Sequence, residues 1–293
     1  GVRVGGGVQV VFTLIKIGLI GFIVVAGLTW GGTRATPPAA PAVALTFSGF
    51  FAALVAALWA YDGWNNVSMV AAEVRQPQRN LPRALIWGTL TVMGIYLLAN
   101  AAYFAVLSAP EVATSNRVAA TMMDKVAGGG GAGAVSVAAM ISIFAALNGS
   151  ILAGARVPYA MARDGLFFRR LAGVHPHWRT PAPSIAAQCG WAALLVFSGH
   201  YEQLFTYVIF ASWIMYGMTT AAVIVLRHKR PDLPRPYRTV GYPVVPVLFV
   251  LTASVLVLST LFDSPGESLR GIILIALGLP FYFHWKRRRI PRR

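Results

Sequence analysis

The sequence predicts an all-α integral membrane protein with eight transmembrane helices. Hydrophobic residues make up 57% of the 293 positions and charged residues only 12%, whereas soluble domains carry about 25% charged residues. This balance excludes an ordinary soluble enzyme. A helix needs about 20 mostly apolar residues to cross a bilayer. The chain offers eight stretches of this kind: Val8–Trp30, Phe47–Ala72, Ala84–Leu107, Ala134–Tyr159, Ser184–Gly199, Leu204–Leu226, Pro243–Phe262 and Leu269–Trp285.

Positive charge marks alternate connectors between these stretches. One set of connectors, together with the two ends, holds Arg3, Arg75, Arg79, Arg83, Arg156, Arg163, Arg169, Arg170, Arg179, Arg227, Lys229, Arg230, Arg235, Arg238, Lys286, Arg287, Arg288, Arg289, Arg292 and Arg293. The opposite set holds Arg34, Arg117, Lys125 and Arg270. Loops rich in Lys and Arg face the cytoplasm, so we expect a multi-pass protein of the plasma or inner membrane with both termini cytoplasmic. Because the basic residues alternate by loop, the net charge of +16 does not indicate nucleic-acid binding.

The middle of the second stretch is a poor helix. Asp62, Gly63, Asn65 and Asn66 disfavour a helix interior. Near the middle of a span, such a run predicts an unwound segment that exposes carbonyls on one side and N–H groups on the other, with Asn65 or Asn66 as N-cap. Those partial charges suit a zwitterion. The alternative is a continuous helix whose polar face packs inside the bundle.

Two other spans contain polar residues. Lys16 lies inside the first span, where its ammonium either snorkels to the interface or stays in the bundle as a fixed or titratable cation. Ser150 and Gly154 lie in the fourth span, where small residues permit close helix approach. Glu73 ends the second span, and we expect it to pair with Arg156 or Arg163 as a structural or gating ion pair. The run Gly128–Gly131 is predicted to be a flexible connector.

Enzyme chemistry and metal binding have no support in the sequence. Cys189 is the single cysteine, so neither an internal disulfide nor a cysteine-based zinc cluster is available. The five histidines lack zinc-site spacing, and no nucleophile elbow or clustered Ser/His/Asp set occurs. We therefore expect no enzyme activity, no metal and no cofactor.

Several segments together resemble the amino-acid/polyamine/organocation transporter superfamily, in its L-type amino-acid transporter branch and bacterial relatives. Leu58–Asn66 (LWAYDGWNN) and Ala72–Ala84 (AEVRQPQRNLPRA) resemble that branch's sixth helix and following loop. Ser150–Leu166 resembles its eighth helix and exit, Leu226–Arg238 its loop between helices ten and eleven, and Gln9–Lys16 its fifth helix.

The resemblance implies a LeuT-type fold of two inverted five-helix repeats. It assigns residues 8–30 to helix five, 47–72 to the broken helix six, 84–226 to helices seven to ten and 243–285 to helices eleven and twelve, in a single transmembrane domain over 1–293. Residues 286–293 then form a basic cytoplasmic tail. Helices one to four would be absent, so the resemblance implies a fragment of a longer transporter.

The family's site carries over residue by residue. The carbonyls of Trp59, Ala60 and Tyr61 would receive the substrate amino group, and Trp59 would also be an aromatic gate. Asp62 and Gly63 would line the break, with Asn65 just beyond it. Lys16 matches a lysine that stands where sodium sits in sodium-coupled relatives, with Ser150 and Gly154 on the eighth helix. Mammalian members join a heavy chain through a cysteine in a segment this chain lacks, so no disulfide-linked partner is expected.

The function expected from these residues is amino-acid transport by alternating access, as a sodium-independent permease or exchanger in a lipid bilayer. The alternative is a membrane receptor or scaffold subunit that binds an amine or amino acid without moving it. The sequence identifies neither the amino acid nor the oligomeric state.

Overall fold

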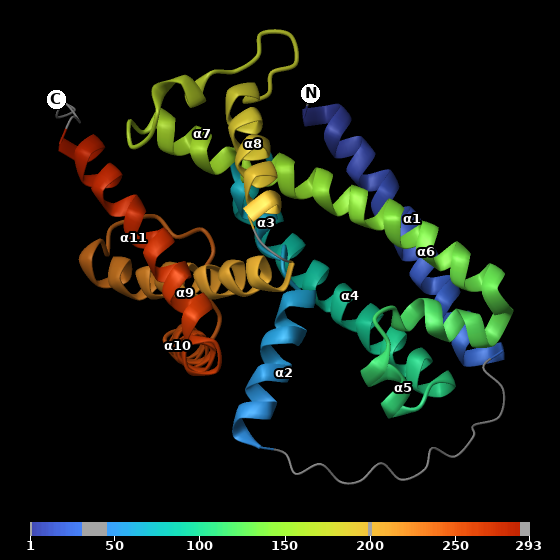
Figure 1. Ribbon diagram of the computed structural model, residues 1–293. Helices are drawn as coiled ribbons and strands as arrows, with labels where there is room; N and C mark the ends of the chain where they lie inside the picture. Colours follow the sequence, from blue (N-terminus) through green and yellow to red (C-terminus); the bar gives the residue numbers. More distant parts are fainter. Residues whose placement is uncertain (1, 31–45, 199–200, 288–293) are drawn as a thin grey trace. The chain divides into compact units, whose positions relative to one another are not determined.

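The computed structural model describes residues 2–30, 46–198 and 201–287, and within them the fold is all-helical, as predicted. The α-helices are α1 (Val2–Trp30), α2 (Phe47–Ala60), α3 (Asn66–Met69), α4 (Pro77–Val106), α5 (Ala109–Thr114), α6 (Val118–Gly154), α7 (Arg156–Arg163), α8 (Ala182–Ser198), α9 (Tyr201–Lys229), α10 (Val244–Asp263) and α11 (Pro265–Arg287) (Figure 1). Two 3₁₀ turns, η1 (Ala71–Glu73) and η2 (Arg169–Ala172), complete the described elements.

Six of the described helical segments are long and apolar enough to cross a membrane. They are Gly5–Trp30, Pro77–Val106, Val118–Arg163, Val208–Lys229, Val244–Asp263 and Pro265–Arg287. The apolar helices α2 and α8 are shorter, at 14 and 17 residues. At 1.5 Å per residue, α2 spans only about 21 Å of a core about 30 Å thick. The count of eight crossings therefore stays a prediction.

The helices form two compact units. The first unit contains α1, α4 from Arg83 onward, α5, α6 and residues 175–180. The second contains α2, α3, the start of α4 and α7 to α11.

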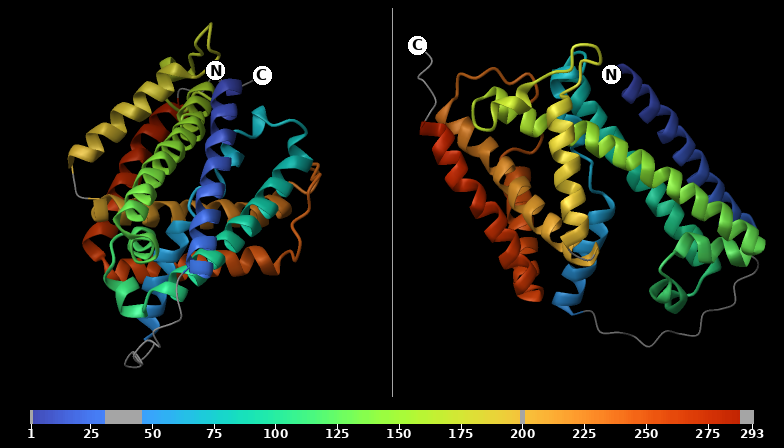
Figure 2. Two further views of the ribbon diagram at one scale, coloured as in Figure 1. Left: turned by 90° about the vertical axis from the view of Figure 1, so that its right-hand side faces the viewer. Right: turned by 45° about the horizontal axis from the view of Figure 1, so that its top comes forward.

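In the first unit, α1 and α6 pack side by side in antiparallel directions (Figures 1 and 2). A Cβ at Gly5 would lie 3.1 Å from Leu152 Cδ1. One turn on, Asn148 Nδ2 donates to Gln9 Oε1 at 3.2 Å. The rings of Phe12 and Phe144 follow, with centroids 6.0 Å apart. Positions 5, 9 and 12 recur at helical spacing, so one face of α1 lies along α6.

The same face of α1 is tightest at Gly27. A Cβ there would lie 2.9 Å from Met122 Sδ, 3.0 Å from Ala102 Cβ and 3.2 Å from the Ala102 carbonyl oxygen. Buried Ile23, Ala26 and Met122 surround this contact and form the core of the unit. Glycine is required here because α1 approaches the backbone of α4.

We expect Gly27→Val to destabilise the protein by about 1–3 kcal/mol, the usual cost of overpacking a filled core. The backbone oxygen of Ala102 cannot give way as a flexible side chain can. Thermal unfolding in detergent measures the effect. Gly18→Val is the matched control on the same helix, because nothing lies within 4 Å of its Cβ position. Equal midpoints for the two variants would contradict this account of the packing.

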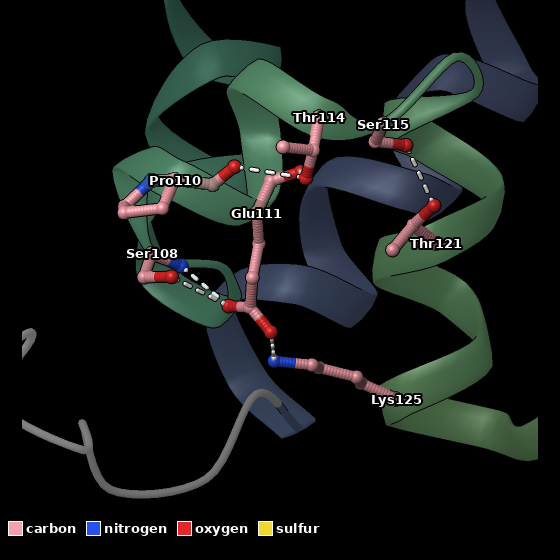
Figure 3. A network of polar contacts seen from close by, with 7 residues as sticks. All are labelled: Ser108, Pro110, Glu111, Thr114, Ser115, Thr121 and Lys125. Atoms are coloured by element: carbon pink, nitrogen blue, oxygen red, sulfur yellow. Dashed lines mark hydrogen bonds and ion pairs between the residues drawn. The ribbon is translucent and has the colours of Figure 1, made fainter.

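The short helix α5 is tied to α6 by a polar network (Figure 3). Glu111 Oε2 accepts bonds from the Ser108 backbone N–H at 2.9 Å and from Ser108 Oγ at 2.8 Å, which is the carboxylate half of a capping box. The Lys125 ammonium of α6 donates to Glu111 Oε1. The bond from Lys125, followed by those from Ser108, lowers the pKa of Glu111 from 4.5 to about 2.

This network predicts a pH-dependent contribution to stability. Since the folded-state pKa of Glu111 lies below its usual value, the ionised carboxylate stabilises the fold above about pH 4.5, and the contribution disappears as the pH falls through about 2. The Glu111→Gln variant should therefore unfold at a lower temperature than the unaltered chain at pH 7. Differential scanning fluorimetry should show the gap narrowing between pH 4.5 and 2. A gap that stays constant over this range would refute the assignment.

The predicted connector at Gly128–Gly131 is reduced to a kink at one glycine. Residues 128–131 lie within the bounds of α6, which consists of two helical segments joined at Gly128, where the backbone leaves helical geometry with φ 68° and ψ −169°. A positive φ suits glycine, which lacks a Cβ. A single glycine thus turns the chain between two helical segments, and the other three continue the helix.

In the second unit, α9 packs against α10 and α11. Phe210 of α9 is 2% exposed, and a Cβ on Gly271 of α11 would lie 3.1 Å from its ring. The buried Ser268 hydroxyl donates to the Thr260 carbonyl at 3.1 Å and closes the turn from α10 to α11. α2 also contacts α10, so the end of α2 is held beside this helical group.

Candidate functional site

The second predicted span is interrupted at the expected residues. α2 ends at Ala60, residues 61–65 form turns, and the four-residue α3 begins at Asn66. The N–H groups of Tyr61 and Asp62 bond the carbonyls of Leu58 and Trp59, three residues back, at 3.2 and 2.9 Å. Gly63 has φ 91°, a conformation that a side chain disfavours. The alternative of a continuous helix is therefore wrong.

Asp62 and its aromatic neighbours line a small pocket with α9. The Tyr216 hydroxyl donates to Asp62 Oδ1 at 3.2 Å. The ring of Tyr216 makes edge contacts with Trp64 at 6.1 Å and with Trp213 at 5.9 Å. The pocket is lined by Leu58, Trp59, Asp62, Trp64, Ile209, Ser212, Trp213 and Tyr216. All of these residues belong to the second unit.

Asn65 lies at the other side of the break. It occupies the N-cap position of α3, but its side chain makes no capping bond. Its backbone carbonyl instead accepts bonds from the Ser68 N–H at 2.9 Å and from the Ser68 hydroxyl at 2.7 Å. Among the described residues, Asn65 Oδ1 is buried without a hydrogen-bond partner. A buried acceptor left unsatisfied is costly, so this oxygen is a candidate to accept a hydrogen bond from a ligand.

The groups around the break are suited to noncovalent recognition. Within a few residues this region offers an aromatic wall, a carboxylate and a buried amide oxygen, beside backbone that has left the α-helical pattern. The carboxylate and the carbonyl oxygens accept hydrogen bonds from an ammonium. Neither a metal-binding group of His, Cys, Asp and Glu nor a second carboxylate for acid–base catalysis lies in this pocket among the residues described.

Glu73 pairs with Arg156, one of its two predicted partners. Arg156 Nε donates to Glu73 Oε1 at 3.0 Å and Nη2 donates to Oε2 at 3.4 Å, a two-pronged arrangement. The Arg156 side chain is only 9% exposed and that of Glu73 is 35% exposed. Arg163, the other predicted partner, lies over the ring of Tyr159 at 5.9 Å. The pair joins η1 to the start of α7.

Lys16 lies on the face of α1 that follows α6. It is partly buried and stands one turn beyond Phe12, which faces Phe144. In this antiparallel pair, Lys16 is therefore level with the region of Met140 and Ile141. Ser150 and Gly154 lie on α6 near the level of Gln9 and Gly5, which are about two and three turns, or roughly 10 and 16 Å, from Lys16 along the axis of α1. The described contacts thus do not bring Lys16 together with Ser150 or Gly154.

Sequence reasoning did not find the α9 side of the pocket. Ser212, Trp213 and Tyr216 lie in an apolar stretch with no break and no charge. Their spacing of one and four residues places Ser212 and Tyr216 on one helix face, but this spacing is also common in packed cores. Only the tertiary contact with Asp62 distinguishes them.

Comparisons with known proteins place this chain in a family. The profile of the amino acid permease family matches residues 1–278. The chain is 34% identical to the human b(0,+)-type amino acid transporter 1 over 97% of its own length and 59% of that protein's. It is 35% identical to the serine/threonine exchanger SteT of Bacillus subtilis, over 99% of this chain and 66% of SteT. It is also 30% identical to the human cystine/glutamate transporter over 77% of this chain and 44% of that protein. The chain thus spans about 59% of the length of the first of these relatives.

Proposed function

Because this chain belongs to the amino acid permease family and is a multi-pass membrane protein, we propose that it serves transmembrane amino-acid transport. The proposed mode is a secondary active permease or exchanger working by alternating access. One observation carries the proposal: the chain leaves helical geometry at Tyr61–Asn65, between the apolar helix α2 and the four-residue helix α3, beside an aromatic pocket. Its relatives include proteins named as an exchanger and as amino acid transporters.

The proposed architecture is the LeuT-type fold that the family implies. Residues 8–30 correspond to helix five, 47–72 to the broken helix six, 84–226 to helices seven to ten and 243–285 to helices eleven and twelve. We propose eight crossings in one transmembrane domain, with α2 and the turns after it together completing the second. The Lys and Arg distribution supports cytoplasmic placement of both chain ends.

The proposed substrate site is the break itself. The carbonyls around Trp59, Ala60 and Tyr61 accept bonds from the substrate ammonium, and Asp62, Gly63 and Asn65 line the unwound turn. Partial charges at a helix break favour a zwitterion over a neutral solute. Lys16 supplies the fixed or titratable cation that replaces sodium, which makes transport sodium-independent. We propose no intermolecular disulfide through Cys189, the single cysteine of this chain, because it lies within α8.

Counterflow in liposomes tests transport against static binding. Liposomes containing the protein that carries this chain are loaded with an unlabelled amino acid and diluted into the same labelled amino acid. The proposal predicts transient accumulation of label above equilibrium, without sodium on either side. A receptor or scaffold would bind the label but would give no overshoot, and that result would overturn the proposal.

The Trp59→Ala variant tests the gate. We expect a several-fold higher half-saturation concentration for uptake, because the indole that lines the pocket beside Asp62 would be lost. Trp178→Ala is the matched control, since Trp178 is an exposed tryptophan of the first unit, outside the pocket. An unaltered rate and half-saturation concentration for Trp59→Ala would count against the gate.

A further inference from the structure

Two segments far apart in the sequence meet in an aromatic cluster of the second unit. Phe167 and Phe168 precede η2, and Trp285 lies near the end of α11. The Trp285 ring centroid is 5.3 Å from that of Phe167 and 4.9 Å from that of Phe168, both in edge geometry. Phe281 stacks on Trp285 at 5.8 Å. The cluster holds the loop after α7 against α11, the last described helix.

Basic side chains flank both halves of this cluster. Arg169 and Arg170 directly follow Phe168, and Lys286 and Arg287 directly follow Trp285; all four are exposed. The nearest acidic residue along the chain is Asp164, at the end of α7. In the part of the chain that the structure describes, neither the Lys125–Glu111 nor the Arg156–Glu73 ion pair uses these four residues, and the Lys286 ammonium lies over the Tyr282 ring at 5.6 Å.

Arginines at the end of α9 and in the loop that follows it make contacts within the protein. Arg235 donates to the carbonyls of Pro231, Leu233, Leu226 and Arg230 at 2.6–3.2 Å, which closes the C-terminal end of α9. Arg227 lies over the Tyr242 ring at 3.7 Å. These guanidinium groups stabilise the fold. Arg169, Arg170 and Arg287 are exposed, lie within two residues of the aromatic cluster in sequence, and take part in neither ion pair.

We propose that Phe167, Phe168, Arg169, Arg170, Trp285 and Arg287 form a binding site for the headgroup of an anionic phospholipid. Tryptophan at the end of a transmembrane helix lies at headgroup depth, and clustered Lys and Arg beside such a helix attract anionic lipid. Arginine also matches a phosphate through two parallel hydrogen bonds. Phe168 and Phe281 are 56% and 55% exposed, so the apolar side of the cluster is available to the glycerol and upper acyl region.

A lipid fits this site better than free phosphate does. The exposed rings are continuous with the apolar surface of α11, where Leu277, Phe281 and Phe283 are each more than half exposed. A soluble anion would contact only the guanidinium groups and would gain nothing from the rings. The proposal concerns a surface of the second unit alone and does not depend on transport.

Fluorescence quenching in nanodiscs tests the site. The protein that carries this chain is placed in phosphatidylcholine containing a small fraction of brominated phosphatidylglycerol, or the same fraction of brominated phosphatidylcholine. The signal of Trp285 is obtained by subtracting the Trp285→Phe variant. Phosphatidylglycerol should quench Trp285 more strongly, and Arg169→Gln/Arg170→Gln should weaken its apparent affinity about fivefold for each arginine removed. Millimolar inorganic phosphate should not reverse the excess quenching.

The matched control is Lys229→Gln/Arg230→Gln. It removes the same charge from exposed positions at the end of α9, and it should leave the excess quenching intact. Arg169→Lys/Arg170→Lys keeps the charge and should retain most of it. Equal quenching of Trp285 by the two brominated lipids would overturn the proposal. So would an equal loss in the two glutamine variants, which would indicate bulk charge, or reversal by phosphate, which would indicate a general anion site.

Discussion

Replacing Lys16 by alanine should either abolish amino-acid uptake or leave an uptake rate that no longer depends on pH. The protein should still insert in the membrane. An ionisable side chain at bilayer depth is costly and persists where it has a role. Lys16 is partly buried and lies one turn from Phe12, on the α1 face that follows α6. Initial uptake rates in liposomes between pH 5 and 8 measure the effect.

The control for this variant is Lys229→Ala, which removes an exposed lysine at the end of α9. It should leave both the rate and the pH profile unchanged. Surface biotinylation or reconstitution yield shows whether the Lys16→Ala variant is inserted. Normal uptake by inserted Lys16→Ala protein, with an unchanged pH profile, would exclude the coupling role.

Removing the Glu73 carboxylate should destabilise the protein strongly. The Arg156 side chain is 9% exposed, so Glu73→Gln would leave a nearly buried guanidinium without its anion. Breaking a fully buried pair costs about 3–5 kcal/mol. Because Glu73 is 35% exposed and water screens part of the loss, we expect about 2 kcal/mol, measured as a lower unfolding midpoint in detergent.

A double variant shows whether the loss of stability comes from the broken ion pair or from any substitution at this place. Glu73→Gln/Arg156→Met should recover much of the lost stability, because it removes the stranded charge together with its partner. Arg163→Gln is the surface control, since Arg163 is exposed and should shift the midpoint little. If Arg163→Gln and Glu73→Gln were equally damaging, the pair would not be the source of the effect.

The sequence located the break well because its signal is local. Asp62, Gly63 and Asn65 disfavour helix wherever they are placed, and Gly63 takes the positive φ that this composition permits. The expected capping by Asn65 is absent, because its side chain turns inward and a Ser68 hydroxyl bonds its carbonyl. A cap depends on a rotamer, which composition does not determine.

Tertiary partners were harder to predict than local conformation. The hydrogen bond from Tyr216 to Asp62 joins residues 154 positions apart. The apolar sequence pattern of α9 does not predict this bond. Glu73 had two plausible arginine partners, and packing selects Arg156. Lys16, Ser150 and Gly154 were grouped by resemblance, whereas the register of α1 on α6 separates Lys16 from the other two. Register depends on the fit of facing side chains, here Gln9 with Asn148 and Phe12 with Phe144.

The most direct test of the central claim measures substrate protection at the break itself. Cys189→Ser removes the single cysteine of the chain, and Ala60→Cys then places one thiol at the exposed end of α2. Labelling by a water-soluble thiol reagent should slow several-fold when a transported amino acid is added, whereas labelling of Thr114→Cys, exposed on α5, should not change. Equal labelling rates at Ala60→Cys with and without the amino acid would contradict a substrate site at this break.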